Sequence, residues 1–376
     1  MGKEVRIKRS GYNPFILLPT LILLLIGLVA IYSASSFLAQ REAGMSTFYF
    51  KRQMIFSLTG ILLMIGAKNF PIDLFNRYSW IIYLLLVFSL IPLVFLLIPG
   101  FERAAGGAKR WIHLGGFSFQ PSEFLKLTLS FYVAYSMSKK IDMMKSFSKG
   151  FLPHIVVISI FLILIHEQPD MGTCIIISAW TIIMLFIGGA RIIHIIMLIL
   201  VSLPALIFLI LKEGYRLMRW KAMLNPWEDP YGYGYQIIHS LIAFGSGGLT
   251  GVGLGNSIQK MFYLPTPHTD FIMSIIAEEV GFIGCFSVIF LFSILIYEGI
   301  VVSLNARDLF RSYLALGLVL FLALEVITNL GVVMGMLPPK GLTLPLISYG
   351  GSSLFKTLIT IGLLLNISSE RKRLKR

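Results

Sequence analysis

Long, nearly uninterrupted runs of apolar residues alternate with short polar connections along most of this chain. Each run is roughly as long as the ~20 residues that an α-helix needs to cross about 30 Å of hydrocarbon. The runs lack the apolar–polar alternation that is typical of a transmembrane β-barrel. We therefore predict an all-α integral membrane protein with about ten transmembrane helices. The predicted spans are residues 14–36, 54–67, 79–98, 122–138, 152–166, 173–189, 192–211, 271–298, 312–336 and 344–366.

One long polar segment, residues 212–269, separates the seventh predicted span from the eighth. Long inserts in a tightly connected protein often carry function, so we predict a large extracytoplasmic loop here. Its glycines, Gly245 to Gly255, do not satisfy the spacing of a dinucleotide-binding fingerprint, and no strand precedes them. The predicted organisation is a basic cytoplasmic tail (1–13), one transmembrane domain (14–366) and a second basic cytoplasmic tail (367–376).

The charge distribution indicates an orientation and a ligand class. Hydrophobic residues make up 56% of the chain and charged residues 13%, with a net charge of +14. Both tails are rich in Lys and Arg, which predicts a multi-pass protein of the cytoplasmic (inner) membrane with both termini cytoplasmic. Contact with anionic lipids explains the excess better than nucleic acid does. Two outer loops, 103–110 and 212–221, also gather cations, which indicates an anionic ligand on the outer side. The two cysteines lie within spans, and we predict no metal site.

Asp270 stands between a proline-rich segment and the apolar run that begins at Phe271. Ionisable residues at such places are costly and often functional. The alternative is a helix N-cap that is favoured by the helix dipole. For Glu278 and Glu279, further along the same span, we expect packing against a Lys or Arg of another span.

Several other polar positions allow a structural or a functional interpretation. Arg110 beside Trp111 is either an interface anchor or a phosphate clamp. Glu123 and Lys126 are three residues apart and share a helix face, as expected of a structural ion pair. We also predict that Asp170 caps a helix, that Lys356 pairs with Glu325, and that the small residues from Ser348 to Ser353 either allow close helix packing or contact phosphate.

Taken together, these motifs resemble the SEDS family of bacterial cell-wall polymerases. The motifs are Lys109-Arg110-Trp111, Gln120-Pro121-Ser122-Glu123, Gln168-Pro169-Asp170, Pro267-His268-Thr269-Asp270-Phe271, and the run from Pro339 to Ser353. The last run is similar to the division branch, FtsW, and its sporulation relative SpoVE, more than to the elongation branch, RodA. Thr266 stands where the family tends to have Glu.

The resemblance implies a peptidoglycan glycosyltransferase that polymerises lipid II at the outer membrane face during cell division, with Asp270 as the catalytic residue. One carboxylate that accepts a proton from the acceptor hydroxyl suffices, since the donor already carries a pyrophosphate leaving group. Lys109, Arg110 and Lys340 would stabilise the pyrophosphate, with Mg²⁺ or Mn²⁺ as an optional aid and no other cofactor. The further candidate substrate-binding residues are Glu123, Lys126, His268, Thr269, Ser348 and Ser352.

The resemblance also implies a class B penicillin-binding protein as partner, together with other membrane proteins of the division machinery. Two other functions stay open: a lipid II flippase, and a non-catalytic division scaffold. A transporter places polar groups near the membrane midplane. Most polar residues of this chain instead gather at the outer edge, with Glu325 and Lys356 as the main exceptions, and this favours the enzyme.

Overall fold

The computed structural model describes residues 12–98, 103–105, 108–114 and 117–370. The helices of the first half are α1 (Pro14–Ala43), α2 (Phe48–Asn69), α3 (Asp73–Arg77), α4 (Trp80–Phe95), α5 (Pro121–Lys139), η1 (Ile141–Met143), η2 (Phe147–Phe151), α6 (Leu152–Glu167) and α7 (Met171–Ile187). Those of the second half are α8 (Ile192–Lys212), α9 (Gly214–Leu224), η3 (Pro226–Glu228), α10 (Tyr235–Gly247), α11 (Ile272–Leu304), α12 (Leu309–Val333) and α13 (Gly351–Ser369).

A helix of at least 16 residues stands at the place of every predicted span, which confirms the all-α membrane fold. Within the described residues, seven helical stretches are long and apolar enough to cross a membrane, and α4 and α7 are shorter apolar helices. The second predicted span, 54–67, is too short to cross, and α2 makes up the length by beginning at Phe48. Part of the insert is helical: it folds into α9, η3 and α10, and an irregular stretch then leads to Asp270.

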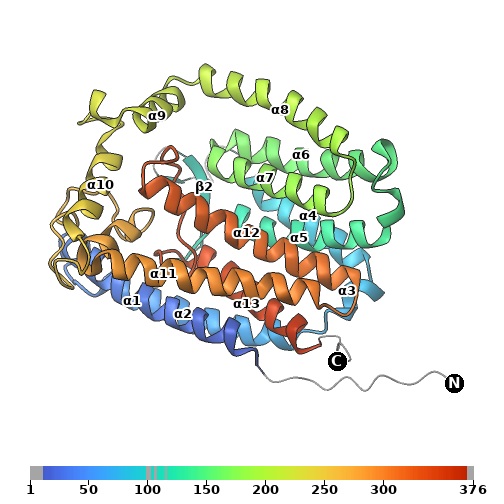
Figure 1. The fold of residues 1–376 in the computed structure, drawn as a ribbon, viewed down its shortest axis with the longest axis horizontal. Helices are drawn as coiled ribbons and strands as arrows, with labels where there is room; N and C mark the ends of the chain where they lie inside the picture. Colours follow the sequence, from blue (N-terminus) through green and yellow to red (C-terminus); the bar gives the residue numbers. More distant parts are fainter. Residues whose placement is uncertain (1–11, 99–102, 106–107, 115–116, 371–376) are drawn as a thin grey trace.

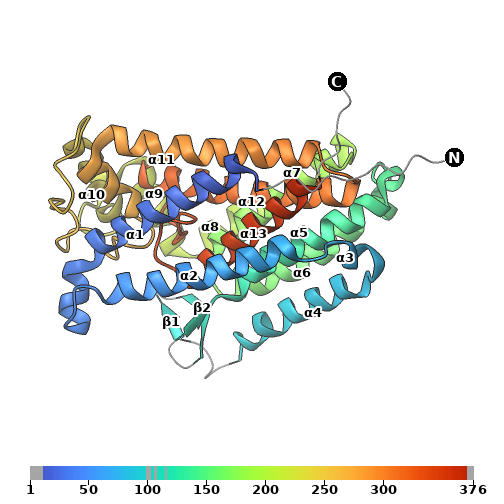
Figure 2. The same cartoon turned by 90° about the horizontal axis from the view of Figure 1, so that it is seen from below.

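The helices run roughly along one axis as an elongated bundle (Figures 1 and 2). α13 packs along α2, α12 lies against α5 and α11, and α1 and α10 both pack on α11. α12 and α13 are the most buried of the helices that could span a membrane. By contrast, α8 arches away from the other helices in Figure 1, and most of its side chains are exposed. α8 therefore contributes little to the core.

A small antiparallel sheet precedes α5, and sequence analysis did not predict it. Its strands are β1 (Arg103–Ala105), β2 (Ala108–Leu114) and β3 (Phe117–Phe119), in the order β1-β2-β3. Ile112 pairs with Phe119 and Leu114 with Phe117. The sheet gives Arg110 a fixed position in β2, at the end of the bundle that carries the insert.

The opposite end of the bundle is held by a cluster around Arg311, on the first turn of α12. This guanidinium, 2% exposed, forms ion pairs with Asp73 and Glu370, each at 2.9 Å, and with Asp308. Asp308 also caps α12 through the N–H of Arg311. The described chain begins and ends near this cluster, so we call it the terminal end and the other the insert end.

Candidate active site

Asp270 lies at the insert end, two residues before α11 begins. Its backbone carbonyl accepts a hydrogen bond from Asn329 Nδ2 at 2.9 Å, and the same amide reaches the Leu342 carbonyl at 2.7 Å. The N-cap residue of α11 is Phe271, and no side chain caps this helix. The Asp270 carboxylate has no hydrogen-bond or ion-pair partner among the described residues. Asp270 therefore does not cap its own helix, and the carboxylate is available for chemistry.

The carboxylate lines a cavity of about 510 Å³, which we call the Asp270 cavity. Four cationic side chains from different parts of the chain also line it. Arg52 comes from α2, Arg110 from β2 and Arg219 from α9, while Lys340 lies in the connection between α12 and α13. Such a convergence is expected where a ligand with several negative charges binds.

Arg110 and Asp270 approach the same glycine. An ideal Cβ built on Gly341 would lie 3.5 Å from Asp270 Oδ2 and 3.6 Å from Arg110 Nη1. Gly341 has φ of +56°, a left-handed conformation that side chains rarely adopt. The turn after Lys340 thus leaves space between the carboxylate and the guanidinium because it lacks a side chain.

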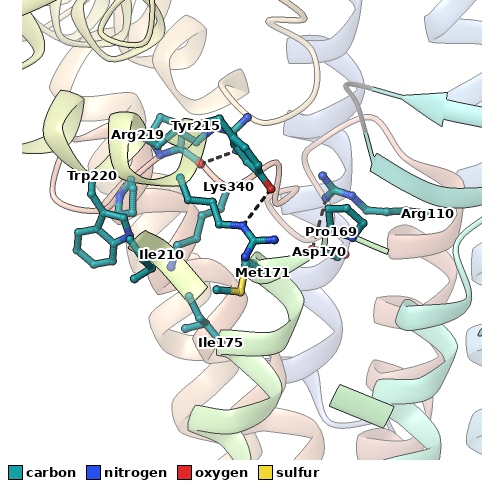
Figure 3. A pocket seen from close by; sticks show the side chains of 14 residues that line it. Arg110, Pro169, Asp170, Met171, Ile175, Ile210, Tyr215, Arg219, Trp220 and Lys340 are labelled. Carbon is teal, nitrogen blue, oxygen red and sulfur yellow. Dashed lines mark hydrogen bonds and ion pairs between the residues drawn. The ribbon is translucent and has the colours of Figure 1, made fainter. Parts of the chain in front are cut away.

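A smaller pocket of about 60 Å³ shares Arg110, Arg219, Pro339 and Lys340 with the Asp270 cavity (Figure 3). Arg110 Nη1 forms an ion pair with Asp170 at 3.4 Å, and Arg219 Nη1 donates to the Pro339 carbonyl at 3.3 Å. Asp170 also caps α7 by accepting from the Thr173 N–H, which confirms the predicted capping role. Two cations of the cavity are thus held in place by the surrounding loops.

The electrostatics of the site suit a general base. Burial raises the pKa of Asp270 to about 6, although the charges of Arg110 and Arg219 act in the opposite direction. Burial also lowers the pKa of Lys340. A base with a pKa near the operating pH combines a sizeable ionised fraction with good proton affinity.

Glu123 lines the cavity and belongs to a ring of four buried charges. Lys126 Nζ contacts Glu123 at 2.6 Å and Glu325 at 2.7 Å, and Lys356 contacts Glu325 and, at 3.5 Å, Glu123. The predicted Glu123–Lys126 and Lys356–Glu325 pairs are both confirmed. Since the ring joins α5, α12 and α13, Lys126 serves the structure and does not reach the cavity wall.

Three other predicted binding residues also lie outside the cavity wall. His268 is 4% exposed and packs between the rings of Tyr49 and Tyr349, and burial lowers its pKa to about 4. Ser348 Oγ donates to the Thr269 carbonyl, and Ser352 Oγ accepts from the Gln120 N–H. These side chains fix the loops that frame the cavity.

Thr269, like Glu123, does line the cavity, whereas the side chain of Lys109 lies outside the described residues. Of the predicted substrate-binding residues, Arg110, Lys340, Thr269 and Glu123 line the Asp270 cavity, whereas the three loop-fixing residues and Lys126 do not.

Arg52 and Arg219 belong to none of the motifs that the sequence displays. Arg219 lies within the cation-rich stretch 212–221 that indicated an anionic ligand, but nothing in the sequence showed which of its cations faces the site. Arg52 precedes the second apolar run, which is too short to cross a membrane. This shortness indicated that the helix begins before the run and includes Arg52, as α2 does.

The expectation for Glu278 and Glu279 was wrong in one respect. The cation that pairs with Glu279 comes from the insert and not from another span: it is Lys260, at 2.7 Å. Glu278 accepts hydrogen bonds from the insert backbone at residues 258 and 259. Sequence spacing gave no sign that the insert folds back against α11.

The described residues offer no group of three His, Cys, Asp or Glu side chains that could hold a metal ion. Of the two cavity carboxylates, Glu123 is already bound by lysines. A dedicated protein cage for Mg²⁺ or Mn²⁺ does not fit this arrangement, and we derive no step through a metal.

Comparison with known proteins places this geometry in a family. The profile described as "Cell cycle protein", FTSW_RODA_SPOVE, matches residues 14–373. The chain belongs to the FtsW/RodA/SpoVE family. It is 46% identical to the probable peptidoglycan glycosyltransferase FtsW of Trichlorobacter lovleyi, over 96% of this chain and 94% of that protein. It is 44% identical to the stage V sporulation protein E of Bacillus subtilis, over 96% and 98%.

Solved structures agree with this assignment. One is described as the structural coordination of polymerization and crosslinking by a peptidoglycan synthase complex; it matches with a TM-score of 0.75 and 26% identity, over 95% of this chain and 98% of that chain. The rod shape determining protein RodA of Thermus thermophilus matches with a TM-score of 0.70 and 26% identity, over 96% and 98%. The chain is thus a multi-pass membrane protein of this family.

Proposed function

We propose that this protein is a peptidoglycan glycosyltransferase that polymerises lipid II at the outer face of the cytoplasmic membrane. The observation that carries the proposal is the Asp270 carboxylate, which lacks a partner among the described residues and lines a cavity with four cations. The names of the relatives support the activity and favour a role in cell division. The cationic tails support an orientation with the insert end outside.

In the proposed reaction, Asp270 accepts the proton of the acceptor sugar hydroxyl. The hydroxyl oxygen forms a bond to the anomeric carbon of the donor while the bond from that carbon to the diphosphate breaks. The diphosphate departs with the bonding electrons, and the anomeric centre inverts. Arg110, Arg219 and Lys340 stabilise the charge that develops on the leaving group. No general acid is required, because a diphosphate leaves without protonation.

A partner is part of the proposal. The relatedness to a complex that polymerises and crosslinks peptidoglycan supports pairing with a crosslinking enzyme, for which a class B penicillin-binding protein is the candidate. The flippase alternative has less support, because the charges within the bundle interior, Lys126, Glu325 and Lys356, are engaged with one another.

The test is the Asp270→Asn variant, purified with its partner and given lipid II. We expect polymer formation to fall by about 10²–10⁴-fold, the usual contribution of a general base, while lipid II still binds. Asp142→Asn is the matched control, since it makes the same change at an exposed site on η1. Polymer formation by Asp270→Asn at the rate of the control would exclude the proposed role. A vesicle assay for lipid II translocation, run on both variants, separates transport from polymerisation.

A further inference from the structure

α11 is broken at Gly281, where φ of 71° and ψ of −161° are not helical. The break divides the helix into an upper segment, residues 272–280, which follows directly on Asp270, and a lower segment, residues 282–304. A helix break leaves backbone groups without their usual partners four residues away. These groups, and what replaces their partners, decide how firmly the upper segment is held.

The insert supplies the missing partners. The N–H groups of Phe282 and Ile283 donate to the carbonyls of Gly248 and Leu249, at 2.9 and 3.2 Å. In the other direction, the carbonyls of Glu278 and Glu279 accept from the N–H groups of residues 252 and 253, each at 3.0 Å. An ideal Cβ on Gly281 would lie only 2.4 Å from the Gly251 nitrogen, so this close approach requires glycine.

The Glu279 side chain strengthens the contact between the insert and the upper segment of α11. Glu279 Oε1 accepts from Lys260 Nζ at 2.7 Å and from Ser33 Oγ at 2.6 Å, and Lys260 also donates to Ser33 at 3.0 Å. Lys260 and Glu279 are both about 2% exposed, so the ion pair is shielded from solvent. It links the insert, α1 and the upper segment of α11 in one buried contact.

The break at Gly281 and the ion pair beside it are therefore separated from Asp270 only by the upper segment of α11. Near its start, the upper segment is fixed by the Ser240–Ser274 hydrogen bond to α10, at 2.7 Å. At its far end, the Glu279–Lys260 ion pair sets its angle relative to the lower segment. A shift of about 1 Å in a reacting group can lower a rate by as much as about 10²-fold.

We infer that Glu279 and Lys260 are positioning residues that fix the upper segment of α11 and thereby set the place of the Asp270 carboxylate among the cavity cations. The inference rests on the proposed function, because the pair acts through Asp270. It gives the insert a definite task, which is to hold the broken helix in the geometry that the reaction needs.

The test compares Glu279→Gln with the double variant Glu279→Gln/Lys260→Met. The single variant leaves a buried ammonium without its counter-ion, so it should lower the Tm. The double variant removes both charges, which is often nearly neutral for stability, so its Tm should recover. We expect the polymerisation rate per folded enzyme to stay at least about tenfold below wild type in the double variant, with the KM for lipid II within about threefold. Recovery of the rate together with the Tm would overturn the inference.

A milder pair of variants keeps the test decisive if the charge variants fold poorly. Ser33→Ala removes one hydrogen bond to Glu279, and we expect the rate to fall about two- to threefold without a change in KM. Ser35→Ala is the matched control on the same helix, because among the described residues Ser35 Oγ bonds only to the Ile31 carbonyl of its own turn. Equal rates in these two variants would contradict the inference.

Two further measurements separate positioning from general loss of structure. Arg311→Gln breaks a buried ion-pair cluster at the terminal end, so it should lower the Tm and leave the rate per folded enzyme within about twofold. An equal loss of rate there would contradict a specific role for Glu279.

Asp270→Asn in the same assay tests the proposed function: full activity of that variant rejects the function, whereas full activity of the double variant alone rejects only the positioning role.

Discussion

The Asp270 cavity and the charge ring of Glu123, Lys126, Glu325 and Lys356 are built from the same kinds of residue, yet they differ in how their charges are satisfied. In the ring, each carboxylate contacts both lysines, and all four residues are buried. In the cavity, the Asp270 carboxylate shares a wall with four cations but contacts none of the described residues through an ion pair.

The charges of the ring hold helices together, whereas the Asp270 carboxylate faces a cavity that can receive a ligand. A buried ion is tolerated when its partners are in place, and the ring provides them from within the chain. The cavity instead gathers three arginines and Lys340 around a carboxylate that has no ion-pair partner among the described residues, which suits an anionic ligand. Glu123 belongs to both regions, so the ring fixes one part of the cavity wall.

The largest expected effect comes from breaking the ring. Glu325→Gln removes one of the two carboxylates that Lys126 and Lys356 share, so Glu123 alone is left to balance both lysines. Losing one partner of a buried pair costs about 3–5 kcal/mol. We expect this variant to accumulate poorly in membranes and to unfold at a lower temperature, as measured by yield and thermal unfolding in detergent. Glu228→Gln, at an exposed position of the insert, is the control and should behave as wild type. Normal stability of Glu325→Gln would show that the ring is dispensable.

An intermediate effect is expected from filling the space between Asp270 and Arg110. Gly341→Ala places a methyl group within 4 Å of both side chains, and we expect polymerisation to fall by about tenfold. The left-handed φ adds strain of about 1–2 kcal/mol. Gly44→Ala is matched for strain, since Gly44 has φ of +68° and no atom near its Cβ position. If both variants lose the same activity, strain and not intrusion is responsible.

The smallest effect is a shift in pH dependence. Asp270 must be ionised to accept a proton, so activity should fall as the pH drops through about 6. Because the charge of Arg219 lowers the pKa of Asp270, Arg219→Gln should raise that pKa and move the acid limb of kcat/KM to higher pH by about one pH unit. Arg216→Gln, on the same helix, should leave the midpoint in place. A midpoint that does not move in Arg219→Gln would mean that another group limits the rate at low pH.

The helices, one ion pair of the ring and the place of Asp270 could be predicted from the sequence. Long apolar runs fix the helices, since hydrocarbon leaves few other structures available. The pairing of Lys356 with Glu325 was predicted because each is an isolated charge within a span, and an isolated charge there needs a partner. The position of Asp270 at a helix start followed from the prolines before it.

The remainder depends on contacts between segments distant in sequence. Arg52 and Arg219 are 167 residues apart in sequence, and only the folded chain brings both to one cavity. Glycine is common in membrane-spanning helices, so Gly281 alone does not predict a break in α11. The break is recognised only from the folded structure, in which the insert packs against Gly281. His268 is part of a family motif, but its ring packs between Tyr49 and Tyr349 because the loop turns it inward.

The charge ring has a consequence for a membrane that carries a voltage. A single elementary charge that moves across 100 mV gains or loses about 2.3 kcal/mol, so an isolated lysine at this depth would respond to the energised state of the cell. The ring contains two positive and two negative groups, and its sum is zero. The electric field therefore exerts no net force on the ring as a unit.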